Sequence, residues 1–266
     1  MTSSAQKLTV SDGSTIAWEE RGAGKPILLI MGLGAGRSAW NLHAQAFEKT
    51  FRCLIPDNRG IGDSSAPAGP YTTTQMADDH AAVIRAAGEE RASVVGISLG
   101  GAIAQQLALR HPDLVEKLVL VSTWARCLPS SVDCFEELQE LRPKLTPAEF
   151  TRRLQHLIWT PETINKNYFN LHDDRFQTDQ WTMTHEAFSA QCEAALSHDT
   201  SAQLSEIAAP SLITVGTHDI FTPVHSSMEL ANGIPNSRLE KFTGDGHAHH
   251  WESLDRFNAL CEEFLN

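Results

Sequence analysis

Three residues in this sequence, a serine, an aspartate and a histidine, each follow an apolar run and could act together on one substrate. Ser98 lies between two glycines in the stretch GISLG, where an apolar β-branched run gives way to a helical pattern. Asp219 and His247 each follow a later apolar run. A serine hydroxyl is a weak nucleophile at neutral pH, so it needs an imidazole that takes its proton and a carboxylate that orients the imidazole. These residue types predict Ser98 as nucleophile, His247 as general base and Asp219 as the orienting acid.

The elements that would position these groups can be predicted from hydrophobic periodicity. Apolar runs alternate with helical patterns, which predicts an α/β fold with a mostly parallel, twisted sheet and helices on both faces. A hairpin is expected around Asp12-Gly13, and six further strands are expected in KPILLIMGLG, FRCLIPDN, ASVVGIS, KLVLVST, PSLITVGT and SRLEKFT. Helices are expected in SAWNLHAQAF, TTTQMADDHAAVIRAAG, GGAIAQQLALRHP, PVHSSMELANGIP and SLDRFNALCEEFL.

This arrangement would bring the three chemical groups to one rim. In an open parallel sheet, ligands bind outside the carboxyl ends of the strands. Ser98, Asp219 and His247 all follow such strand ends. The stretch GISLG alone could also be a glycine-rich turn with an incidental serine, but three suitable groups at strand ends favour catalysis.

A run of helical patterns interrupts the alternation after the sixth strand. Segments such as CFEELQELRPKLTPAEFTRRLQHLIW follow one another without an intervening strand. This predicts a helical cap at about 125–205, inserted into a single domain that spans residues 1–266.

Composition narrows the classes of ligand and the compartment. The chain has 266 residues, a formal charge of −12 and five cysteines without a C-x-x-C pair. The negative charge disfavours nucleic acid and anionic membranes as partners, and the scattered cysteines fit free thiols in a reducing compartment. No leader pattern or long apolar span is present in the sequence, so we expect a soluble, cytoplasmic protein.

Cofactors and metals are not expected. No cluster of His, Cys, Asp or Glu has the spacing of a metal site, and the stretch GLGAG lacks both the Lys-Ser/Thr of a P-loop and the spacing of a dinucleotide motif. The expected partner is a small-molecule ester or lactone. The oligomeric state is left open, a homodimer included.

Four stretches are similar to motifs of one known family: GISLG, DNRGIGDSS, GTHDIFTPV and GDGHAHHWES. They resemble the nucleophile turn, the turn after the fourth strand, the acid loop and the histidine loop of the α/β-hydrolase family. The resemblance covers nearly the whole length of the chain, and within the family it is to the small esterase and enol-lactonase branch. The stretch STWARCLPSSVDCF is similar to the aminoacrylate hydrolases of bacterial pyrimidine breakdown. The resemblance implies an oxyanion hole made by the backbone amides of Leu33 and Leu99. Many relatives carry His-Gly before that loop, whereas this chain has Met31-Gly32.

The resulting hypothesis is a cofactor-independent serine hydrolase that cleaves a small carboxylic ester or lactone through an acyl-enzyme. Two alternatives stay open, because a fold does not fix a function. One is a non-hydrolytic enzyme of the same fold, a lyase or a cofactor-free oxygenase, and the other is a ligand-binding receptor with a vestigial triad. Met31 and Trp124 are candidate pocket residues, while other aromatic residues could either line the pocket or pack in the core: Trp40, Trp159, Trp181, Phe135 and Phe169.

Several residues near the motifs are expected to have other roles. His249 and His250 are assigned a lining or surface role, and His218 a structural one. Asp57 and Arg59 are expected to brace the turn after the fourth strand. Asp245 lies only two residues from His247 on one short loop, so it has little freedom to turn back to the imidazole and is expected to stand outside the triad.

Overall fold

A mixed eight-stranded sheet forms the centre of the molecule. The computed structural model describes residues 5–171 and 183–266. The sheet has the order β1-β2-β4-β3-β5-β6-β7-β8, in which β1 and β2 form the expected hairpin, β2 pairs antiparallel with β4, and all other pairs are parallel. The strands are β1 (Gln6–Thr9), β2 (Thr15–Arg21), β3 (Lys25–Ile30), β4 (Phe51–Pro56), β5 (Ala92–Ile97), β6 (Val115–Val121), β7 (Ser211–Gly216) and β8 (Ser237–Phe242).

Helices cover both faces of this sheet. Neighbouring residues of a strand point to opposite faces, so the strands present apolar side chains on both faces. On β3, Ile27 and Leu29 belong to one hydrophobic core, together with residues of α1 (Asn41–Phe47) and α11 (Leu254–Leu265). Leu28 and Ile30 belong to the core on the other face, with α2 (Thr73–Ala86), α3 (Leu99–Arg110) and α9 (Val224–Gly233). The predicted fold class is therefore confirmed.

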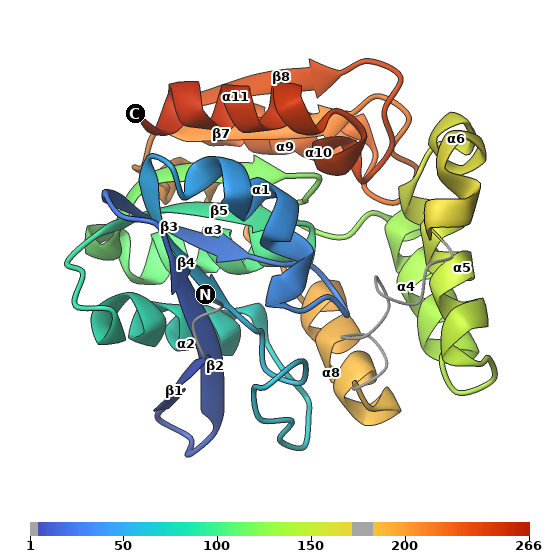
Figure 1. Cartoon of the computed structure of the whole chain (residues 1–266), viewed down its shortest axis with the longest axis horizontal. Coiled ribbons are helices and arrows are strands. Elements are labelled where there is room, and N and C mark those ends of the chain that lie inside the picture. Colours follow the sequence, from blue (N-terminus) through green and yellow to red (C-terminus); the bar gives the residue numbers. More distant parts are fainter. Residues whose placement is uncertain (1–4, 172–182) are drawn as a thin grey trace.

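Four described helices lie between β6 and β7. They are α4 (Pro129–Leu141), α5 (Pro147–Ile158), α6 (Pro161–Leu171) and α8 (His185–Leu196). Figure 1 shows α4, α5 and α6 beside one another at the right of the view, away from the strands. The two ends of this helical segment meet beside the sheet, where the Thr200 amide donates to the Ala125 carbonyl at 2.9 Å. The assignment of one domain with a cap at about 125–205 stays a prediction.

The remaining elements are short. The predicted helix 38–47 is divided into the 3-10 turn η1 (Arg37–Trp40) and α1, and α10 (His249–Glu252) precedes α11. The other 3-10 turns are η2 (Pro112–Leu114) and η4 (Leu204–Glu206). Over the described part of the chain, no helix combines the length and the apolar character needed to cross a membrane, and no group of three or more His, Cys, Asp or Glu side chains could hold a metal ion.

Candidate active site

Ser98 occupies a strained turn between β5 and α3. Its backbone has φ 54° and ψ −119°, a conformation that residues with a side chain rarely adopt and that costs about 1–3 kcal/mol. The flanking glycines make the turn possible. A Cβ on Gly96 would lie 2.3 Å from the Gly100 carbonyl oxygen, and one on Gly100 would lie 2.3 Å from the Ile30 carbonyl oxygen. The motif GISLG is therefore required by close backbone contacts, and these contacts fix the direction in which the serine points.

Asp219 lies in the loop after β7 and is held by four donors. Its Oδ1 accepts from the amides of Phe221 (2.9 Å) and Thr222 (2.7 Å). Its Oδ2 accepts from the Thr222 hydroxyl at 2.8 Å and from His247 Nδ1 at 2.9 Å. Burial disfavours the charged carboxylate, but the neighbouring His247 and these hydrogen bonds outweigh burial and lower the pKa of Asp219 below its ordinary value. Asp219 is therefore an ionised acceptor at neutral pH.

His247 lies in the loop after β8, and its Nδ1 contacts Asp219. In the neutral imidazole, the contact with Asp219 places the proton on Nδ1 and leaves the lone pair on Nε2. The imidazole is 7% exposed, and the Phe221 ring meets it edge-on at 5.1 Å between centroids.

Two consecutive residues at the end of β6 hold the backbones of Ser98 and His247 to the same strand end. The Ser98 amide donates to the Val121 carbonyl at 2.8 Å, and the Ser122 hydroxyl donates to the His247 carbonyl at 2.9 Å. Ser122 also has a left-handed φ of 45°. No hydrogen bond joins the two described side chains Ser98 and His247 directly, and catalytic hydrogen bonds often become short only when substrate binds.

Asp245, the other carboxylate close to His247 in the sequence, forms its hydrogen bond with a different residue. Its Oδ2 accepts from the Ser253 hydroxyl at 2.5 Å. Burial raises the pKa of this carboxyl above its ordinary value. The carboxylate that contacts the imidazole of His247 is that of Asp219.

The loop after β3 passes close to Ser98. A Cβ on Gly32 would lie 3.2 Å from the Ser98 Cβ. Within residues 5–171 and 183–266, the amides of Leu33 and Leu99 donate to no acceptor, so both are available to a ligand. Their assignment to an oxyanion hole stays a prediction. We call residues Met31–Gly36 the glycine loop below.

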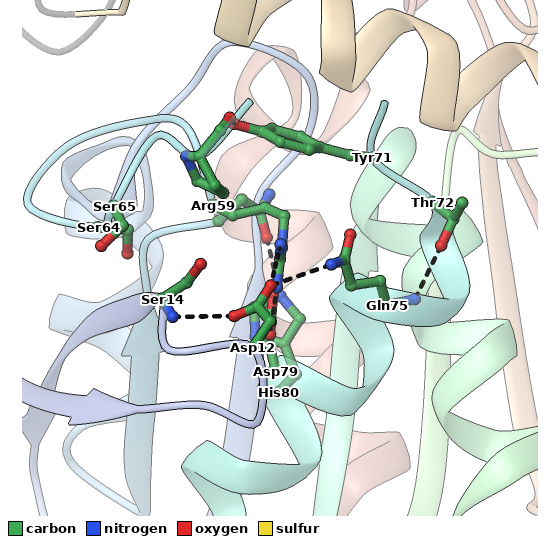
Figure 2. A network of polar contacts seen from close by, with 12 residues as sticks. Asp12, Ser14, Arg59, Ser64, Ser65, Tyr71, Thr72, Gln75, Asp79 and His80 are labelled. Carbon is green, nitrogen blue, oxygen red and sulfur yellow. Dashed lines mark hydrogen bonds and ion pairs between the residues drawn. The ribbon is translucent and has the colours of Figure 1, made fainter. Parts of the chain in front are cut away.

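The turn DNRG after β4 is braced as expected. Figure 2 shows Arg59 reaching between Asp12 and Asp79. Its guanidinium donates twice to Asp79, at 2.7 and 2.8 Å, and once to Asp12 at 3.0 Å. Asp57 accepts from the amides of Arg37 (2.7 Å) and Asp63 (3.0 Å).

The assignment of His249 and His250 to a lining or surface role is wrong. Both side chains are buried in the core against α11. His249 contacts the hydroxyls of Ser122 (3.1 Å) and Thr214 (2.9 Å), and burial lowers its pKa to about 3. The packing of α10 and α11 against the sheet, which sequence spacing does not reveal, accounts for the error. His218 is exposed, and its main-chain amide donates to the Asp245 carbonyl at 2.8 Å.

The candidate pocket residues are both buried. Met31 is 3% exposed, and Trp124 is 1% exposed and packs against Phe135 at 5.5 Å. Their contact with substrate stays a prediction. The other aromatic residues divide as follows: Trp40 and Phe135 are in the core, Trp159 stacks on Trp251, and Trp181 and the Phe169 side chain lie outside the described residues.

Sequence reasoning missed the residues that hold the site in place. Thr222 is three residues after Asp219, a spacing at which a hydroxyl can reach back to a carboxylate. Glu252 accepts from the Gly246 amide at 2.5 Å and from the Thr160 amide at 2.9 Å. Ser122, Asn58 and Gln191 act across long sequence separations, which no local pattern could have indicated.

A family model, a sequence relative and two solved structures all match this chain over most of its length. Residues 25–254 match the family described as the alpha/beta hydrolase fold. A protein of Azorhizobium caulinodans named "Putative carbamate hydrolase RutD" is 31% identical over 247 residues, which are 93% of each chain. The crystal structure of a hydrolase from Pseudomonas aeruginosa is 27% identical, with a TM-score of 0.89 over 98% of both chains. The enol-lactonase from Burkholderia xenovorans is 26% identical, with a TM-score of 0.89 over 98% of this chain and 99% of that chain.

Proposed function

The chain belongs to the α/β-hydrolase family, and on this premise we propose that it is a serine hydrolase that cleaves a small carboxylic ester or lactone through an acyl-enzyme. The observation that carries the proposal is the buried pair of Asp219 and His247, joined at 2.9 Å. This pair leaves Nε2 of the imidazole free to accept a proton, and Ser98 stands on a strained turn tied to the same strand end.

The reaction begins with attack by the Ser98 hydroxyl on the substrate carbonyl carbon. The hydroxyl proton passes to His247 Nε2, and Asp219 stabilises the imidazolium that forms. The tetrahedral intermediate collapses as the carbon–oxygen bond to the leaving alcohol breaks and His247 returns the proton to that oxygen. Water then attacks the acyl-enzyme, with His247 again as base, and releases the carboxylic acid and Ser98.

Negative charge on the intermediate requires donors that are already in place. The amides of Leu33 and Leu99 supply them in this proposal, because both are unpaired within the described part of the chain. A donor of this kind typically contributes about 3 kcal/mol to transition-state stabilisation.

The relatives suggest which carbonyl compounds to test. Esters and lactones are the first candidates, since the Burkholderia xenovorans protein is an enol-lactonase. A carbamate is the second candidate, favoured by the 31% identical relative that is named for it. A carbamate carbonyl can be attacked by the same serine, so a matched panel of esters, lactones and carbamates would rank the three classes by kcat/KM.

A fluorophosphonate probe tests the mechanism independently of the substrate. We expect one covalent adduct on Ser98 in the wild type and none in Ser98→Ala, with thermal unfolding used to check that this variant is folded. An inert wild-type protein would instead favour a non-hydrolytic enzyme or a receptor with a vestigial triad.

A further inference from the structure

Gln191 connects a helix between β6 and β7 to the loops beside Ser98. It lies on α8 and is fully buried. Its Oε1 accepts from the Gly34 amide at 3.0 Å, and its Nε2 donates to the Arg59 carbonyl at 2.8 Å. Both ends of one side-chain amide are therefore used, one on the glycine loop and one on the turn after β4.

The same side of α8 packs on these loops at van der Waals distance. A Cβ on Gly34 would lie 3.3 Å from the Phe188 ring, and one on Gly60 would lie 3.2 Å from the Ala187 Cβ. Gly69 approaches Ala190 so closely that an added Cβ would lie 2.8 Å from it. Residues 187, 188, 190 and 191 share one face of a helix, so α8 is seated directly on the glycine loop.

Further side-chain contacts hold the glycine loop and Arg59 in place. Asn58 donates to the Met31 carbonyl at 2.8 Å and accepts from the buried His80 at 2.8 Å. Arg59, whose carbonyl accepts from Gln191, is fixed by its ion pairs with Asp79 and Asp12 (Figure 2). The loop is thus held at Met31 from one side and at Gly34 from the other, and the Leu33 amide lies between these two points.

We propose that Gln191 is a positioning residue that sets the direction of the Leu33 amide, so that the oxyanion hole is complete only when α8 is seated on the glycine loop. The inference rests on the proposed serine hydrolase. Gln191 acts through the backbone of residues 31–34 and does not touch the reacting atoms. Its loss should therefore lower stabilisation of the oxyanion and leave substrate binding in the ground state largely unchanged.

Gln191→Met tests this, because methionine keeps the length of the side chain and removes both hydrogen bonds. A matched control is Gln139→Met. Gln139 donates to Ser189 on the same helix, to the carbonyl at 3.3 Å and to the hydroxyl at 3.0 Å, without touching the glycine loop. For Gln191→Met we expect a ten- to hundredfold loss of kcat with KM within about threefold of wild type, the scale of a small misplacement of a catalytic group. Gln139→Met should stay within about threefold in both.

An inhibitor that forms an oxyanion separates positioning from general loosening. A trifluoromethyl ketone adds to the serine hydroxyl and places a negative oxygen in the hole. Its inhibition constant should rise in Gln191→Met by the factor that kcat falls, and should not change in Gln139→Met.

In Gln191→Glu, low pH should restore part of the lost activity. An ionised glutamate can accept from the Gly34 amide but repels the Arg59 carbonyl oxygen, whereas a protonated glutamate can donate to that oxygen. The ratio of its kcat to that of wild type should rise as pH falls. Equal losses in Gln191→Met and Gln139→Met, or a change in KM alone, would overturn the inference while fluorophosphonate labelling of Ser98 still supports the serine hydrolase. A wild type inert to that probe would overturn both.

Discussion

At the scale of single residues, the proposed mechanism depends on which carboxylate orients His247. Sequence nearness favours Asp245, but the structure joins the imidazole to Asp219 at 2.9 Å and Asp245 to Ser253. The four donors around Asp219 also explain how a buried carboxylate stays ionised. These contacts make the roles of the two acids separable by mutation.

Asp219→Asn should lower kcat by roughly 10³ to 10⁴, because an asparagine favours the wrong tautomer of the histidine. Asp245→Asn makes the same change of residue type only two residues from His247 and serves as the control. It should cost less than about tenfold. Steady-state kinetics on an activated ester measure both, and a larger loss at Asp245 would mean that the acid is wrongly assigned.

At the scale of elements, the sequence predicted the strands and the chemistry at their ends but not what holds the loops together. The Asp12-Gly13 turn predicted the hairpin. Apolar runs predicted the six further strands, whose residues face a core on each side of the sheet. The contacts of Ser122, Glu252 and Gln191 join segments that are distant in sequence. His249 and His250 were misplaced for the same reason, since the packing of α11 buries them.

The nucleophile turn should tolerate no side chain at Gly96. Gly96→Ala would force a Cβ to within 2.3 Å of the Gly100 carbonyl oxygen, so we expect more than about 4 kcal/mol of destabilisation or failure to fold. Gly88→Ala is a useful control, because Gly88 has φ +78° and open space around it. That change should cost only about 1–2 kcal/mol of left-handed strain. Unfolding by denaturant would compare the two, and equal losses would contradict the close-contact explanation.

At the scale of the whole molecule, buried neutral histidines make stability depend on pH. Burial lowers the pKa of His43 and His198 to about 4, that of His80 and His249 to about 3, and that of His250 well below its ordinary value. In the unfolded chain these side chains take up protons below about pH 6.5. Stability is therefore complete above that pH and is lost as pH falls toward the folded-state values.

The expected loss at pH 5 is about 2 kcal/mol for a histidine whose folded-state pKa is about 4, such as His198. Melting temperature should fall steadily between about pH 7 and pH 5, above the range in which Asp219 would be protonated. Replacing the buried His198 by Asn should flatten this slope. A melting temperature that is constant over this range would contradict the prediction.

The proposed mechanism requires that Ser98 carries the acyl group during turnover. The most direct test is to mix the wild-type protein with p-nitrophenyl acetate, quench the reaction at short times and locate the added mass by peptide mass spectrometry. We expect a transient acetyl group on the peptide that contains Ser98, and we expect it to persist longer in Asp219→Asn because deacylation also needs the oriented base. Turnover of the ester without any acyl-enzyme, or an acetyl group on another residue, would contradict the mechanism.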